Sequence, residues 1–211
     1  FDRGEATAQH ALRPAFMPAA KTGTYVIPNG VDIIPRASFS GSKIEKVIIP
    51  SSVTSIEAEA FANCENLSSV VFENPGANGS ALSIGARAFM NCTQLTTITL
   101  PARLASISLL RYDELRIDTF ESINELTEQA NDAFLGCTAL ESINVSQNSS
   151  ATYRSEDGVL LSDNGRTLAY FPAAKSAKNY IFPANVRSIA NGAFLGTSLG
   201  GTLTIPARIT S

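Results

Sequence analysis

Three cysteines recur in the same short context, and their spacing could carry chemistry. Cys64, Cys92 and Cys137 each stand three residues after a phenylalanine, in the segments AFANC, AFMNC and AFLGC. Such a pattern is compatible with metal ligation, disulfide bonds, a reactive thiol or a repeating core. Metal ligands must converge on one point, and a row of parallel Cβ vectors is poor disulfide geometry. We therefore expect three buried free thiols, no metal site and no cofactor.

Other residues that could do chemistry are few. His10 is the single histidine, which argues against a Ser-His-acid triad or a histidine-rich metal cage. The acid pairs Asp113-Glu114 and Glu156-Asp157 are adjacent residues that should point apart into solvent on turns, with no apolar pocket to raise a pKa. We expect no enzymatic activity.

Charge and hydropathy exclude two classes of partner. The chain carries 16 basic and 19 acidic residues, a net charge of -3, and no run of Lys or Arg that could follow a phosphate backbone. Nucleic acid is therefore not expected as a partner. No stretch reaches about 18 consecutive apolar residues, so we expect no membrane span in this chain.

The phenylalanine before each cysteine belongs to a longer repeat. An aromatic residue in this position recurs at Phe39, Phe61, Phe89, Tyr112, Phe134 and Phe194. These markers are 22, 28, 23, 22 and 60 residues apart, so the unit is 22 or 23 residues long and two units carry insertions. The Tyr112 unit fits least well, because Asp118 stands where a leucine is expected, and its regularity stays open.

The sequence of each repeat unit predicts the same succession of strand, corner and turn. Leu95 to Leu100 and Leu140 to Val145 end in alternating apolar and polar residues, which is typical of a short strand with one buried face. A proline-containing corner such as Ile49 to Val53 follows, and then a single helical or 3₁₀ turn such as Glu57 to Phe61. Because one such unit cannot bury its apolar face alone, the units must stack. The pattern predicts a β-rich leucine-rich-repeat solenoid, with a β-hairpin insertion near 150–183 that turns at Asn164-Gly165.

The segment from Ile49 to Val70, IPSSVTSIEAEAFANCENLSSV, resembles the BspA-like leucine-rich repeats of bacterial surface proteins. Tyr153 to Leu160 looks like the Y-x-S-x-D-G-V-L hairpin module found between such repeats. Phe16 to Lys21 and Tyr25 to Pro28 repeat residues 170–175 and 180–183, so we expect the second half of another hairpin near the N-terminus.

The resemblance implies one domain over residues 1–211, with about six repeats, that is truncated at both ends. It implies an extracellular or bacterial cell-surface location, with the signal or anchor removed. It also implies adhesion or protein interaction with host or other extracellular macromolecules. The partner is an extracellular protein or glycan whose identity stays open, as do the oligomeric state, the organism and the mode of anchoring.

The outward side chains of the predicted strands are the candidate binding surface. They should form a stripe on the open sheet face, apolar at one end and rich in hydroxyl groups at the other. Its members are Lys46, Ile48, Ser69, Val71, Thr97, Thr99, Glu121, Ser142, Asn144, Thr202 and Thr204. A rigid, extended face of this kind is what solenoids use to bind macromolecules, although each residue could equally be a solvated strand residue. Two alternatives stay open: a carbohydrate- or cell-wall-binding module, which exposed aromatic residues in a row would favour, and a structural spacer of a larger surface protein.

Overall fold

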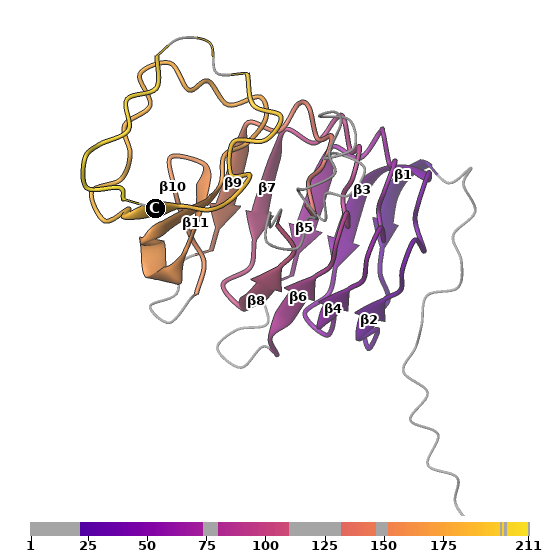
Figure 1. The fold of residues 1–211 in the computed structure, drawn as a ribbon. Coiled ribbons are helices and arrows are strands. Elements are labelled where there is room, and N and C mark those ends of the chain that lie inside the picture. The colour runs from indigo at the N-terminus through magenta and orange to yellow at the C-terminus, as the bar shows by residue number, and fades with distance from the viewer. Residues whose placement is uncertain are drawn as a thin grey trace, which may run out of the picture.

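Two rows of short parallel strands run along the molecule (Figure 1). The computed structural model describes residues 22–73, 80–109, 132–146, 152–198, 200 and 202–210. The first row comprises β1 (Thr22–Val26), β3 (Lys43–Ile49), β5 (Ser69–Phe72), β7 (Thr97–Leu100) and β9 (Ser142–Val145). The second row comprises β2 (Ile33–Ile34), β4 (Ser55–Ile56), β6 (Leu82–Ile84) and β8 (Leu104–Ile107). The predicted solenoid is confirmed, with about six turns.

The strands follow the alternation in the sequence. In β7, Ile98 and Leu100 are buried, whereas Thr97 and Thr99 are exposed. Neighbouring strands of the first row pair in parallel within two ladders, β1-β3-β5 and β7-β9, and β5 lies beside β7. Each turn therefore buries its apolar face against the next one, which a single repeat could not do.

A stack of aromatic rings forms the centre of the core. Phe39 lies 4.9 Å from Phe61, Phe61 lies 5.4 Å from Phe89, and Phe89 lies 5.8 Å from Phe134, measured between ring centroids. The main chain follows the same order, because Phe61 N donates to Ala88 O and Phe89 N donates to Ala133 O, both at 2.8 Å. Four of the six marker residues, Phe39, Phe61, Phe89 and Phe134, thus form the centre of the solenoid core.

The stack passes directly from Phe89 to Phe134. Phe89 and Phe134 face each other with an interplanar angle of 12°, and β7 pairs directly with β9. Tyr112 itself lies outside the described residues. The regularity of its repeat therefore stays open, and the structure shows only that the Phe89 and Phe134 rings are in direct contact. The ring that follows Phe134 in the stack is Tyr170, at 5.7 Å.

The short segment before each marker also differs from the prediction. Glu57 to Phe61 forms successive hydrogen-bonded turns and not a helical turn, with Glu59 at φ 59° and Asn63 at φ 57°. Among the described residues, helical structure is limited to the 3₁₀ turn Asp163–Gly165. Each complete unit also contains two strands, not one, because the corner after the proline adds a strand of two to four residues to the second row.

The insertion is confirmed as a hairpin. The strands β10 (Arg154–Glu156), β11 (Val159–Ser162) and β12 (Thr167–Tyr170) pair antiparallel in that order. The chain turns between β11 and β12 at Asn164 (φ 58°) and Gly165 (φ 86°). β12 then pairs in parallel with β13 (Ser188–Ile189), so the hairpin returns the chain to the solenoid.

The expected second half of another hairpin near the N-terminus stays a prediction, because the residues that would match β12 lie before Thr22 and outside the described residues. Tyr25 lies in β1, which pairs in parallel with β3 as a strand of the solenoid. Residues 16–21, the other half of that prediction, lie outside the described residues.

Candidate interaction surface

The outward side chains of the first strand row form two lines across the sheet. In one line Thr24 pairs with Lys46 and Lys46 with Ser69; in the other Val26 pairs with Ile48 and Ile48 with Val71. The lines continue in the next ladder, where Thr97 pairs with Ser142 and Thr99 with Asn144. Parallel strands are spaced about 4.8 Å apart, so both lines are nearly continuous. We call these ten positions of β1, β3, β5, β7 and β9 the open face.

The open face changes character along its length. In β1, β3 and β5 one of its two lines is apolar, with Val26 56% exposed, Val71 38% exposed and Ile48 half-buried between them, and the other line is polar, with Thr24, Lys46 and Ser69. Its second half is polar, with Thr97 and Thr99 exposed. An apolar patch bordered by hydroxyl groups, lysine and asparagine is the common composition of a protein interface.

The hairpin limits the open face beyond β9. Ile143 N donates to Gly158 O at 2.8 Å, and Val145 N donates to Ser155 Oγ at 2.8 Å, so the hairpin is attached directly to β9 (Figure 1). Ser142 and Asn144 are therefore half-buried, and Ser142 Oγ donates to Asn144 Oδ1 at 3.3 Å.

The structure brings together eight of the eleven residues that we predicted for this surface. Thr202 and Thr204 are exposed but lie in no strand, and the hairpin separates their segment from β9. Glu121 lies outside the described residues. Sequence reasoning missed Thr24 and Val26, although Val26-Ile27-Pro28 repeats the pattern of Ile48-Ile49-Pro50 and could have identified them.

The three thiols are buried, as predicted. Cys64 Sγ donates to Phe39 O at 3.0 Å, Cys92 Sγ to Phe61 O at 3.3 Å, and Cys137 Sγ to Phe89 O at 3.0 Å. Burial raises the pKa of the Cys64 thiol, and a hydrogen bond with Cys137 together with burial raises the pKa of the Cys92 thiol. All three cysteines are free, and the described residues contain no group of three metal-ligating side chains. Each thiol ties one turn to the preceding one.

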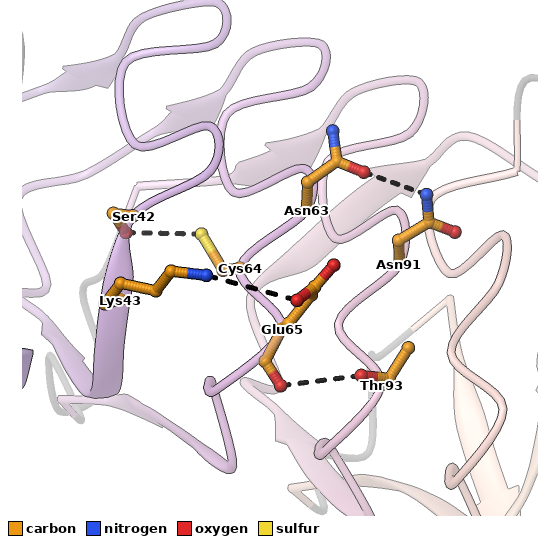
Figure 2. Close-up of polar contacts among 7 residues, drawn as sticks. All are labelled: Ser42, Lys43, Asn63, Cys64, Glu65, Asn91 and Thr93. Atoms are coloured by element: carbon orange, nitrogen blue, oxygen red, sulfur yellow. Dashed lines mark hydrogen bonds and ion pairs between the residues drawn. The ribbon is translucent and has the colours of Figure 1, made fainter. Parts of the chain in front are cut away.

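Side-chain contacts in the core and at the surface make the same connection between turns (Figure 2). Asn91 Nδ2 donates to Asn63 Oδ1 at 2.8 Å, and Ser42 Oγ lies 3.3 Å from Cys64 Sγ. Lys43 Nζ lies 4.0 Å from the Glu65 carboxylate. These contacts join equivalent positions of neighbouring turns, so they serve the architecture of the solenoid.

A hollow lies where the main-chain hydrogen bonds between successive turns are interrupted at Phe134. Phe134 N donates to its neighbour Asp132 Oδ1 at 2.9 Å, whereas Phe61 N and Phe89 N donate to carbonyls of the following turn. The hollow beside this break has a volume of about 590 Å³, and both Asp132 and Tyr170 line it.

Among the carboxyl groups that the structure describes, Asp132 is the one with a clearly shifted pKa. Burial raises its pKa to about 7, although hydrogen bonds from Phe134 N and Tyr170 oppose the shift. A carboxyl group with such a pKa could act as a general acid or base. Asp132 is only 2% exposed and already accepts both hydrogen bonds. Its carboxyl group therefore serves better as the acceptor for Phe134 N, which has no carbonyl partner in a following turn, than as a catalyst.

The acidic pairs do not form a catalytic arrangement in the described part of the chain. Glu156 and Asp157 are exposed, and Asp157 Oδ2 lies 3.1 Å from Lys175 Nζ. Asp113, Glu114 and His10 lie outside the described residues. Across the residues that the structure describes, no helical segment has the length and apolar character that a bilayer crossing requires.

Sequence comparison identifies repeats of the same kind. Residues 13–81, 76–156 and 168–211 match the sequence model of the BspA type Leucine rich repeat region, in six copies. No curated protein matches the sequence.

Solved structures of bacterial proteins share the fold. A leucine rich cell surface protein from Faecalibacterium prausnitzii is 25% identical with a TM-score of 0.57, over 82% of this chain and 38% of that protein. The pneumococcal vaccine antigen PcpA is 23% identical with a TM-score of 0.57, over 77% of this chain and 34% of that protein. A leucine-rich repeat protein from Eubacterium ventriosum is 22% identical with a TM-score of 0.52, over 89% of this chain and 48% of that protein. The chain thus spans about a third to a half of these structures.

Proposed function

Because the chain belongs to the BspA-type leucine-rich repeat family, we propose that it is a non-enzymatic adhesion module, displayed outside a bacterial cell, that binds extracellular macromolecules through the open face. Membership of this family points to protein interaction in general. The surface location is supported by the cell surface protein of Faecalibacterium prausnitzii, which shares the fold.

The observation that carries the proposal is the continuity of the open face. Five strands hold two lines of accessible side chains on a backbone that ladder hydrogen bonds and a buried ring stack already fix. A partner that binds there does not have to order the surface first, which lowers the entropic cost of association. The apolar patch of Val26, Ile48 and Val71 supplies the area that a stable interface desolvates, and the threonines supply a polar border.

Two alternatives are less well supported. A carbohydrate-binding role for this face would be favoured by exposed aromatic rings, and none of the ten positions of the open face is aromatic. A purely structural spacer would leave the apolar patch without a partner. The patch therefore favours binding over spacing.

The test is a binding screen followed by paired variants. The chain is immobilised and presented with extracellular matrix proteins, and each protein that binds is measured again with Thr99→Glu and with Ser106→Glu. Both residues are exposed strand hydroxyls, Thr99 on the open face and Ser106 in the second strand row. We expect about tenfold weaker binding for Thr99→Glu alone, the size of effect that a buried interface position gives.

Equal affinities for the two variants would move the binding site away from the open face. A screen in which no extracellular protein binds would favour the spacer.

A further inference from the structure

The two last turns of the solenoid form a basic hollow at one corner. Arg166 directly precedes β12 and Arg187 directly precedes β13, and these strands pair in parallel with Thr167 opposite Ser188. Arg187 N donates to Arg166 O at 2.7 Å, so the two arginines occupy neighbouring positions of one ladder. The hollow has a volume of about 630 Å³ and is lined by Asn164, Arg166, Asn185 and Arg187.

The hollow keeps hydrogen-bond donors available for a ligand, although the Arg187 side chain is held in place. Arg187 Nη1 donates to Ala184 O at 2.7 Å and to Val186 O at 3.0 Å, which anchors the side chain and leaves its other N–H groups available. In the described part of the chain, the side chains of Arg166, Asn164 and Asn185 take part in no hydrogen bond or ion pair. All four lining residues are exposed to solvent.

The charge of the hollow departs from that of the chain. The protein has a net charge of -3, yet the four lining residues carry two positive charges and no negative one. Asp163 is the adjacent acid in sequence, and its Oδ2 accepts hydrogen bonds from Thr167 Oγ1 at 2.7 Å and Ser162 Oγ at 3.5 Å. Within the described residues neither arginine forms a salt bridge. Two neighbouring unpaired guanidinium groups form an anion site.

From this geometry we propose that the corner of Asn164, Arg166, Asn185 and Arg187 binds an acidic glycan through a sulfate or carboxylate group. Neighbouring parallel strands place the two arginines about 4.8 Å apart, close enough for both guanidinium groups to engage one planar or tetrahedral anion. The two asparagine amides each offer a donor and an acceptor, which match the hydroxyl groups of a sugar ring beside the anion. This site is separate from the open face and does not depend on what that face binds.

The probe is a fluorescent heparin hexasaccharide, with polygalacturonate for carboxylates and dextran as the neutral polymer. We expect heparin and polygalacturonate to bind, more weakly as salt is raised, and dextran not to bind. Arg166→Gln should weaken binding about tenfold, since it removes one charge-assisted contact. Arg166→Lys should recover only part of the loss, because an ammonium group lacks the two-point fork.

Lys43→Gln is the matched control, because it removes the same charge from the opposite end of the solenoid, where Lys43 pairs loosely with Glu65. In the described residues the Arg166 side chain makes no hydrogen bond or ion pair, so its replacement should leave the fold intact, which circular dichroism verifies. Equal affinities for Arg166→Gln and Lys43→Gln would overturn the proposal. So would dextran binding as tightly as heparin, or neither anionic polymer binding. A phosphorylated peptide that bound more tightly than both glycans would overturn the ligand class.

Discussion

Replacing Asp132 by asparagine should stabilise the protein at neutral pH and remove most of its pH dependence. The carboxyl group is 2% exposed, and its pKa in the folded protein is about 7, compared with 3.8 in the unfolded chain. Between these two values the folded protein keeps a proton that the unfolded chain releases. Stability is therefore greatest below about pH 4 and falls as pH rises towards 7.

The size of the effect follows from the shift. One pKa unit corresponds to about 1.4 kcal/mol, so the full shift costs up to about 4 kcal/mol once pH exceeds 7. Between pH 5 and pH 7 the unfolding free energy should fall by about 2 to 3 kcal/mol. The asparagine amide cannot ionise, but it can still accept the hydrogen bond from Phe134 N and donate to the hydroxyl group of Tyr170.

The assay is urea unfolding at several values between pH 5 and pH 8, followed by circular dichroism because the chain contains no tryptophan. Few other groups titrate between pH 5 and pH 8, because His10 is the only histidine in the sequence. Asp157→Asn is the control, because it makes the same chemical change in an exposed carboxylate that pairs with Lys175. A wild-type protein with a constant unfolding free energy over this range would contradict the raised pKa of Asp132, and so would an Asp132→Asn variant that retains the wild-type slope.

Three other predictions concern the core. Phe61→Ala should lower the unfolding free energy by about 3 to 5 kcal/mol, because Phe61 is fully buried between Phe39 and Phe89; a loss under 1 kcal/mol by urea titration would contradict this. Cys64, Cys92 and Cys137 should react with a thiol reagent only after denaturation, since all three are buried; ready labelling of the native protein would show that they are accessible. Gly136→Ala should lower the melting temperature more than Gly41→Ala. Both glycines have positive φ, but only a Cβ at Gly136 would meet the Asn91 side chain. Equal decreases in melting temperature would contradict this close contact.

The repeat and its core could be predicted from the sequence because they depend on local spacing. Phe39, Phe61, Phe89 and Phe134 recur in the same context, and burial in a stack is the simplest physical reason for that recurrence. The alternation of Thr97, Ile98, Thr99 and Leu100 likewise fixes which side chains face outward. The open face follows from this alternation and the parallel register.

Spacing alone could not decide whether the Tyr112 unit is regular, and Tyr112 lies outside the described residues. The distance from Tyr112 to Phe134 is 22 residues, which equals one repeat, so counting cannot distinguish a turn of the solenoid from a segment between turns. Only the contact of Phe89 with Phe134 decides the order.

The second strand row and the role of Asp132 could not be predicted either. Strands such as Ser55–Ile56 are too short to show an alternation. Asp132 acquires its role because the hairpin interrupts the ladder of main-chain hydrogen bonds after Phe134. A sequence pattern does not show which amide group will lack its usual partner.

The most direct test of the open face is site-specific photocrosslinking to a bound extracellular protein. A photoreactive amino acid replaces Val71 or Thr99 on the open face and, in the control, Ser106 in the second strand row. After irradiation of the complex, we expect adducts from Val71 and Thr99 and none from Ser106. Adducts from Ser106 alone would contradict it and place the partner on the opposite strand row.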